Sequence, residues 1–176
     1  FRGHENGSVL RKSLSSKLRN ALEPDGSLRF PALRGNVNMY RLFLERSIQL
    51  VRSGGRLRMV VPDSLLREKS SVPLRKLLVD GNDWFSTWSF PDSQRVFPGI
   101  TQGVAVVGLE IGGNTTNMMS YGPLTVNDIS SDSGLSSGAP CRGLERGTWS
   151  SWTEAPWAVP RLPVDPAARR GVVDAR

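Results

Sequence analysis

The stretch YRLFLERSIQLVRSGGRLRMVVP, residues 40–62, decides the fold. Its apolar and small side chains recur at the spacing of one helical face, which predicts a helix over residues 40–52. Gly54 and Gly55 end this helix in a tight turn, because glycine adopts a positive φ without a Cβ clash. A short buried strand is predicted at 57–61, bounded by Pro62, which has no amide proton. The helical face that we expect to be buried consists of Tyr40, Phe43, Leu44, Ser47, Leu50 and Val51, and the rest of the helix surface carries Arg41, Glu45, Arg46 and Arg52.

A helix, a tight turn and a buried strand are the repeating unit of a doubly wound α/β domain. Ligands of such domains bind beyond the carboxyl ends of the strands, which here means the segment 61–64. Further along, the pattern predicts a helical turn at 63–69 and a helix at 71–79, with Ser71 as its N-cap. The last two predicted strands are 84–90, with Trp84, Ser86, Trp88 and Phe90 on one face, and 103–111, which is apolar enough to be buried on both faces.

The two ends of the chain are less regular. An amphipathic helix carrying Val9, Leu10, Leu14, Leu18 and Leu22 is predicted first, followed by an extended apolar link at 30–33. After residue 112 the proline, glycine and serine content predicts one short hairpin near 118–126 and then mostly irregular chain. Three tryptophans in that part, Trp149, Trp152 and Trp157, either pack on the same fold or anchor a partner domain, and packing on the same fold is favoured.

The net charge of the 176-residue chain is +7, and most of the excess lies at its start. Residues 1–52 contain ten Lys and Arg against four acidic residues, whereas residues 53–176 contain thirteen against twelve. Each of these cations alone is equally consistent with a solvated surface and with a contact to a polyanion. As a group they indicate a polyanion held by phosphate contacts. A membrane surface fits less well, because no segment combines this charge with a wide apolar face.

One cysteine and one histidine restrict the chemistry that the chain can perform. Cys141 has no partner for an internal disulfide and no neighbouring His to activate it, and His4 lacks the partners of a metal site. No apolar run is long enough for a signal peptide or a membrane span, and the chain does not begin with Met. We therefore expect an internal or C-terminal piece of a larger soluble, cytoplasmic protein.

Residues 90–103, between the last two predicted strands, combine the parts of a site for a planar ring. Phe97 precedes Pro98 at the tip of this loop, and Gln94, Arg95 and Gln102 supply two amides and a cation. Stacking on an aromatic side chain contributes about 1–3 kcal/mol per base, comparable with the few kcal/mol that unstacking one nucleotide costs. Phe97 can therefore hold an extruded base or cap the core beneath the loop, and composition leaves both open.

Two long patterns carry a resemblance to a known family. The first pattern includes Asn38, Tyr40, Phe43, Glu45, Arg46, Gly54, Gly55, Arg56 and Pro62. The second pattern is VFPGITQGVA, residues 96–105. Together, residues 36–111 resemble the second half of the catalytic domain of N6-adenine DNA methyltransferases of the gamma motif order, found in type II and type I restriction-modification systems. The resemblance implies the second half of a Rossmann-like class I methyltransferase sheet with an irregular C-terminal extension. It also implies that Phe97 packs on the flipped adenine.

The resemblance further implies S-adenosylmethionine as the methyl donor of the intact parent, held by a glycine-rich loop upstream of this chain, and no metal for methylation. The catalytic tetrapeptide of the family is absent, with Phe1 as a candidate for its last residue. Residues 1–36 then form a basic loop and helix, 37–112 the C-terminal half of the catalytic domain, and 113–176 an extension towards a target-recognition region. The implied partners are double-stranded DNA and the missing N-terminal half of the polypeptide, and the candidate DNA contacts are Arg11, Lys12, Lys17, Arg34, Arg95 and Gln102.

The leading interpretation is part of an adenine-specific DNA methyltransferase of a restriction-modification or phage-defence system, inactive by itself. The alternative is a noncatalytic DNA-binding module that uses the same basic surface. A metabolic α/β enzyme is disfavoured, because the chain has no acid/base or metal constellation.

Overall fold

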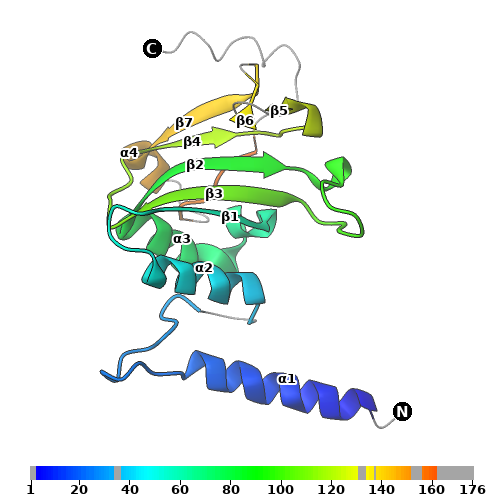
Figure 1. Cartoon of the computed structure of the whole chain (residues 1–176), viewed down its shortest axis with the longest axis vertical. Coiled ribbons are helices and arrows are strands. Elements are labelled where there is room, and N and C mark those ends of the chain that lie inside the picture. Colours follow the sequence, from blue (N-terminus) through cyan, green and yellow to red (C-terminus); the bar gives the residue numbers. More distant parts are fainter. Residues whose placement is uncertain (1–2, 34–36, 131–133, 137, 152–155, 162–176) are drawn as a thin grey trace.

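The structure is a computed structural model that describes residues 3–33, 37–130, 134–136, 138–151 and 156–161. A five-stranded sheet forms the centre, two helices lie against it, and a long helix lies apart from both (Figure 1). The helices are α1 Gly3–Arg19, α2 Met39–Leu50, α3 Val72–Asp80 and α4 Arg146–Ser150. The sheet consists of β1 Arg56–Pro62, β2 Asn82–Phe90, β3 Val104–Ile111, β4 Asn117–Tyr121 and β7 Cys141–Glu145. Shorter elements are the pair β5 Ile129–Ser130 and β6 Gly134–Leu135 and the 3-10 turns η1 Asp63–Leu66, η2 Lys69–Ser71, η3 Asp92–Gln94 and η4 Val126–Asp128.

The strand order is β1-β3-β2-β4-β7. Since β3 is antiparallel to both β1 and β2, these two strands run in the same direction, and β4 is parallel to β2. The carboxyl ends of β1, β2 and β4 therefore meet at one edge of the sheet, on the right in Figure 1. The α/β class expected from the sequence is confirmed.

The main core lies between the sheet and helices α2 and α3. It joins Leu44 of α2 and Leu78 of α3 to Val107 and Leu109 of β3, all of them almost fully buried. The strand β3 is buried on both faces, as its apolar sequence predicts. By contrast β1, predicted to be buried, leaves Arg58 and other alternate side chains exposed, because among the described strands it is an edge strand with helices on one face only.

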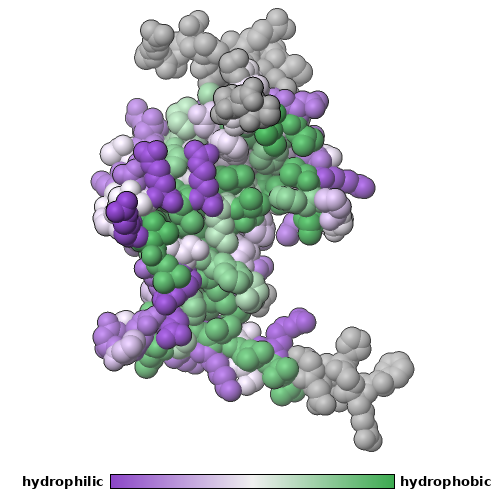
Figure 2. Space-filling view, in the orientation of Figure 1, coloured by the Kyte–Doolittle hydropathy of each residue, from purple (hydrophilic) through white to green (hydrophobic). Residues whose placement is uncertain are grey.

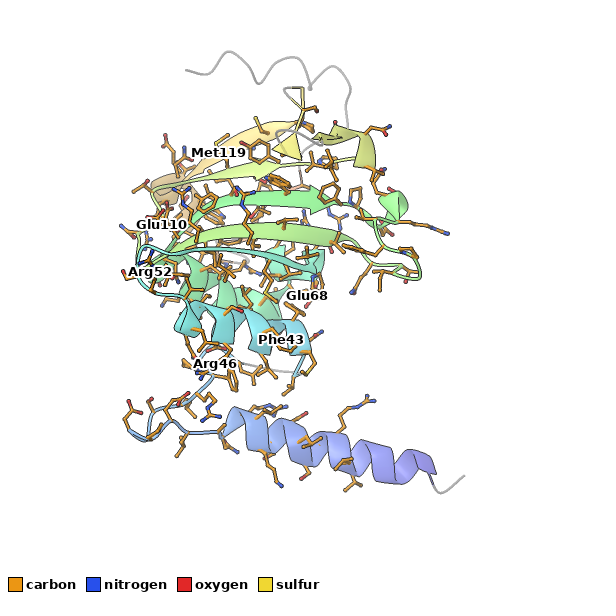
Figure 3. The ribbon with its side chains drawn as sticks, viewed as in Figure 1. Phe43, Arg46, Arg52, Glu68, Glu110 and Met119 are labelled. Atoms are coloured by element: carbon orange, nitrogen blue, oxygen red, sulfur yellow. The ribbon has the colours of Figure 1, made fainter. Side chains whose placement is uncertain are left out.

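The helix predicted at 40–52 is confirmed as α2, but its predicted buried face is only partly right. Leu44 is fully buried, and Tyr40 and Val51 pack against the main core, as predicted. Phe43 is 58% exposed and Leu50 is 69% exposed, whereas Arg41 and Glu45 are buried. The reason is that both buried charges have fixed partners, Glu45 in the loop that precedes α2 and Arg41 in η2, which follows β1. Arg41 donates to the Ser70 and Ser71 hydroxyls, and Glu45 accepts the Ala32 amide at 2.8 Å. Figure 3 shows Phe43 and Arg46 on the side of α2 that faces α1.

Ser71 occupies the N-cap position of α3, as predicted, but its side chain does not cap the helix. The Ser71 hydroxyl accepts a hydrogen bond from Arg41 and makes no cap bond. A second buried cation, Arg75, holds this region together through the carbonyl oxygens of Leu65, Glu68 and Pro156. Burial lowers the pKa of Arg75 to about 10.

The single face predicted for β2 is interrupted by a β-bulge. The register between β2 and β3 shifts between Trp84 and Ser86, which moves the later residues to the opposite face. Trp84 consequently lies in the main core, whereas Trp88 and Phe90 join a second cluster on the other face of the sheet. On that face the Arg58 guanidinium carbon lies 5.3 Å from the centre of the Trp88 ring.

The part after residue 112 is more regular than the sequence predicts. The expected hairpin near 118–126 does not form; instead β4 pairs with β2 on one side and with β7 on the other, which extends the sheet by two strands. Trp149 of α4 is fully buried against Trp84 and Trp157, with ring centroids 5.4 and 5.3 Å apart. The preference for tryptophans that pack on the same fold is confirmed for Trp149 and Trp157, and Trp152 lies outside the described residues.

The predicted N-terminal helix is confirmed as α1, but it ends at Arg19, and most of its apolar side chains, including Leu14, are exposed. The link at 30–33 is a turn and not an extended segment, since the Leu33 amide donates to the Phe30 carbonyl. Phe30 and Leu33 are buried against Leu42 in a small separate cluster. Figure 2, in the orientation of Figure 1, shows hydrophilic groups scattered over the face in view, among apolar groups that continue from the sheet towards α1.

Candidate functional site

The candidate site is the sheet edge where β1, β2 and β4 end. Residues 61–64, which the sequence places at a ligand-binding end, lie there: Asp63 follows β1 directly, and its amide donates to the Gly103 carbonyl. A Cβ atom on Gly103 would lie 2.9 Å from the Asp63 carboxyl carbon, so this close approach of the two strand ends requires glycine. The sequence prediction of the ligand edge is therefore consistent with the geometry.

The loop between β2 and β3 projects from this edge. It begins with η3, after which Arg95 adopts a left-handed conformation with φ of 42° and Gly99 one with φ of 76°. Phe97, between them, is 43% exposed and belongs to none of the buried clusters of the described residues. Of the two roles that the composition leaves open, capping the core therefore has less support than presenting a ring to a ligand.

A cavity of about 510 Å³ lies beside the base of this loop. We call it the edge pocket. Its walls come from Asp63 and Arg67 after β1, from residues 91–94 and 101–103 of the loop, and from residues 120–125 at the end of β4. Ser89, Pro160 and Arg161 complete the walls. The Leu124 amide donates to the Ser89 carbonyl at 2.8 Å, which ties the segment after β4 to the end of β2.

The charged groups of the edge pocket are largely paired with one another. Asp63 accepts from Arg67 at 3.0 Å and lies 3.8 Å from the Arg161 guanidinium. Burial and the neighbouring Arg161 lower the pKa of Arg67, while Asp63 counteracts both. With Asp92 at the rim, two carboxylates face two guanidinium groups, so the pocket has no net formal charge.

The predicted DNA contacts fall into two separate groups. Arg11, Lys12 and Lys17 are exposed on α1, which lies beyond α2 and away from the strand ends (Figure 1). Arg95 and Gln102 are exposed on the loop, and Gln102 also lines the edge pocket. Phe1 and Arg34 lie outside the described residues.

Sequence reasoning missed the wall of the site that is formed by residues 120–125. It also missed the two arginines of the pocket, Arg67 and Arg161. The sequence around Gly122-Pro123 signals a turn, but the prediction of a hairpin there placed it at a hairpin end and not at the carboxyl edge of a parallel strand.

Neither a methyl-donor site nor a metal site is visible in the described ranges. The paired glycines Gly54 and Gly55 precede β1 and so lie at the opposite end of that strand from the edge pocket. No glycine-rich turn from a strand into a helix is present at the carboxyl edge, so the described residues do not fit S-adenosylmethionine. Within the same residues, no group of three His, Cys, Asp or Glu is placed to hold a metal ion. In the part of the chain that is described, no helix has the length and apolar character needed to cross a bilayer.

Residues 19–97 match the family model of the Eco57I restriction-modification methylases. This match spans the central helix and β1 and ends at Phe97, and it confirms the resemblance to restriction-modification methylases seen in the sequence. Among curated protein sequences, none matches the chain.

Two solved structures share the fold. The type IIG restriction endonuclease BpuSI is 16% identical with a TM-score of 0.56, and the match covers 85% of this chain and 18% of that one. The M protein of the type I restriction enzyme EcoKI is 16% identical with a TM-score of 0.55, and the match covers 80% of this chain and 43% of that one. The fold is therefore part of a Rossmann-like sheet, and the chain spans less than half the length of either structure.

Proposed function

We propose that this chain, whose residues 19–97 match the Eco57I restriction-modification methylases, is part of a site-specific DNA methyltransferase that modifies adenine N6. The observation that carries the proposal is the position of Phe97. Its ring is exposed at the sheet edge where doubly wound domains bind ligands, and it is the last residue of the segment that matches the family. Restriction-modification or phage defence is the proposed setting, in the cytoplasm.

Phe97 stacks on the target adenine once that base has left the duplex. Extruding a nucleotide costs a few kcal/mol, and an aromatic platform offsets about 1–3 kcal/mol of this cost. Arg95, on the same loop, contacts the backbone beside the extruded nucleotide, and Gln102 contacts the same DNA strand. S-adenosylmethionine supplies the methyl group in the intact parent. The contribution of this chain is to fix the orientation of the base, since positioning provides much of the rate gain in group transfer.

The second group of contacts is the exposed basic surface of α1. Arg11, Lys12 and Lys17 bind phosphates of the double-stranded DNA, which releases counterions and makes binding dependent on salt. These contacts position the duplex without reading its sequence. Arg34 is also proposed as a DNA contact.

The donor site and the catalytic tetrapeptide lie in an N-terminal half of the same polypeptide, with Phe1 at the junction. In this division residues 1–36 are the basic segment, 37–112 the second half of the catalytic domain, and 113–176 the path towards a target-recognition region. The chain alone is then expected to bind DNA without transferring a methyl group.

The test is transfer of tritiated methyl groups from S-adenosylmethionine to unmethylated DNA by the polypeptide that joins this chain to its donor-binding half. The proposal expects label on adenine N6, at one sequence, and a strong loss of transfer in Phe97→Ala. The matched control is Phe43→Ala, because Phe43 is also exposed but lies on α2.

Two results would count against the proposal. Label on cytosine would contradict the adenine specificity. Absence of transfer together with intact DNA binding would favour a noncatalytic DNA-binding module. This module is the second candidate, because the described residues contain no donor site.

A further inference from the structure

We propose that the edge pocket is a second nucleobase site, which binds a base other than the one stacked on Phe97 and recognises it through Gln94, Gln102 and Ser120. The inference rests on the proposed function in taking DNA as the source of that base. Its argument comes from the walls of the pocket, from their hydrogen bonds and from their charges.

The polar walls of the edge pocket carry neutral groups without partners. The amide-bearing residues Gln94 and Gln102 and the hydroxyl-bearing residues Ser89 and Ser120 are among those that line the pocket. Within the described part of the chain, none of these four side chains makes a hydrogen bond to another residue. Ser120 is only 4% exposed, but its hydroxyl oxygen is not one of the fully buried side-chain atoms, so that oxygen is available to a ligand in the pocket. Since Ser89 and Gln94 are half-buried and Gln102 is exposed, these groups can bond a ligand with several donors and acceptors without breaking a hydrogen bond within the protein.

Apolar surface also lines the edge pocket. Pro91, Tyr121, Pro123 and Pro160 are lining residues that each keep part of their surface accessible, whereas Leu124 is fully buried. A ligand that contacts these side chains with its faces and the amides with its edge has apolar faces and a polar rim. Nucleobases have this combination, and extruded bases are read by edge hydrogen bonds and by stacking on apolar side chains.

The charges of the edge pocket argue against a phosphate. Asp63 is already bonded to Arg67 and lies near Arg161, and the formal charges of the lining residues cancel. An anion would have to compete with Asp63 for both guanidinium groups and would face Asp92 as well. A neutral base meets no such penalty, and its phosphates remain outside, where Arg95 and the 77% exposed side chain of Arg161 lie.

The location connects this pocket to the Phe97 loop. Residues 91–94 and 101–103, the two ends of the loop that carries Phe97, are also two walls of the pocket. A DNA strand whose target base stacks on Phe97 therefore passes the pocket mouth with a neighbouring nucleotide. The volume of about 510 Å³ lies within the range of about 300–1,000 Å³ typical of small-molecule sites. A side-chain amide pairs best with adenine, through a donor and an acceptor side by side.

The test is an NMR titration of the 15N-labelled full chain with four separate probes, adenosine, guanosine, cytidine and thymidine, and with inorganic phosphate as an anion probe. The inference expects one nucleoside to shift the side-chain amide signals of Gln94 and Gln102. It expects an affinity about three- to tenfold lower in Gln94→Leu and in Ser120→Ala, which each remove one hydrogen bond. Gln49→Leu is the matched control, because Gln49 lies on α2, outside the pocket walls. This variant should bind the nucleoside with the affinity of the wild type.

The inference is overturned if no nucleoside shifts these amides, if phosphate alone does, or if both variants bind the nucleoside as tightly as the wild type. Failure of this inference is distinguishable from failure of the proposed function. Methyl transfer to adenine without nucleoside binding would remove only the second site. Nucleoside binding without methyl transfer would leave the pocket assignment intact and remove the methyltransferase proposal.

Discussion

Replacement of Trp149 by alanine tests whether the last described segment belongs to the same folding unit as the sheet. The Trp149 side chain is fully buried, packs on the rings of Trp84 and Trp157, and donates from Nε1 to the Ala158 carbonyl at 2.8 Å. Truncating a buried Trp to Ala typically costs about 3–5 kcal/mol, and each aromatic pair contributes about 0.5–1.5 kcal/mol beyond its buried area. We expect Trp149→Ala to lower the free energy of unfolding by about 4–5 kcal/mol.

The assay is urea denaturation followed by circular dichroism. With a slope of about 2 kcal/mol per molar urea, the loss corresponds to a midpoint about 2 M lower. Trp149→Phe provides a second variant that keeps a ring but loses the Nε1 hydrogen bond, at a cost of about 1–3 kcal/mol. Trp88→Ala is the matched control, because Trp88 is only partly buried on the other face of the sheet, and its loss should be less than half as large. A loss below about 1 kcal/mol for Trp149→Ala, or one no larger than for Trp88→Ala, would refute the packing described here.

Three further predictions concern close packing, pH and salt. Gly108→Ala should cost about 1–3 kcal/mol in the same denaturation assay, because its Cβ would lie 2.6 Å from the Ser86 hydroxyl and 2.9 Å from the Phe85 ring, whereas Gly138→Ala has open space and should be neutral. Burial and the neighbouring Glu110 raise the pKa of Asp83, so its charged form destabilises the fold above that pKa; Asp83→Asn should be more stable than the wild type at neutral pH, and the difference should vanish as the pH falls below the ordinary value of 3.8. A stability difference between Asp83→Asn and the wild type that is equal at all pH values would contradict this pH dependence. Neutralising Arg11, Lys12 and Lys17 together should reduce the slope of log K against log salt for duplex DNA by about 2.7, and an unchanged slope would mean that these cations are merely solvated.

The positions of elements could be predicted from local sequence because each has a local cause. Spacing, the glycine turn at Gly54 and the proline at Pro62 place α2 and β1 within two residues of their observed bounds. The continuous apolar run of β3 likewise predicts its burial on both faces. These signals act within about one turn or one strand of chain, so they need no knowledge of the tertiary structure.

The buried face of α2 could not be predicted because it depends on distant partners. Periodicity ranks Phe43 as buried and Arg41 as exposed, but Arg41 finds acceptors 29 and 30 residues away, at Ser70 and Ser71, and the structure buries it there. A buried cation is acceptable only when it is bonded, and no local pattern reveals the bond.

The site shows the same division between local and distant causes. The loop was identifiable from composition and from a long family pattern, and the role of Phe97 in it stays a prediction. The third wall of the edge pocket was not, since it exists only because β4 pairs parallel to β2, a pairing between segments about 30 residues apart. The extra strands after residue 112 were hidden by turn-rich sequence, in which Pro and Gly mark the loops but not the short strands between them.

The most direct test of the account is the affinity of the intact parent for a duplex whose target adenine is mismatched, compared between wild type, Phe97→Ala and Phe43→Ala. The target sequence follows from mapping the methylated adenine. If Phe97 holds the extruded base, Phe97→Ala should bind this duplex more weakly by about 1–3 kcal/mol, while Phe43→Ala should bind it as the wild type does. Equal affinity of all three proteins, with folding intact, would contradict the assignment of Phe97 to the base site and with it the central claim.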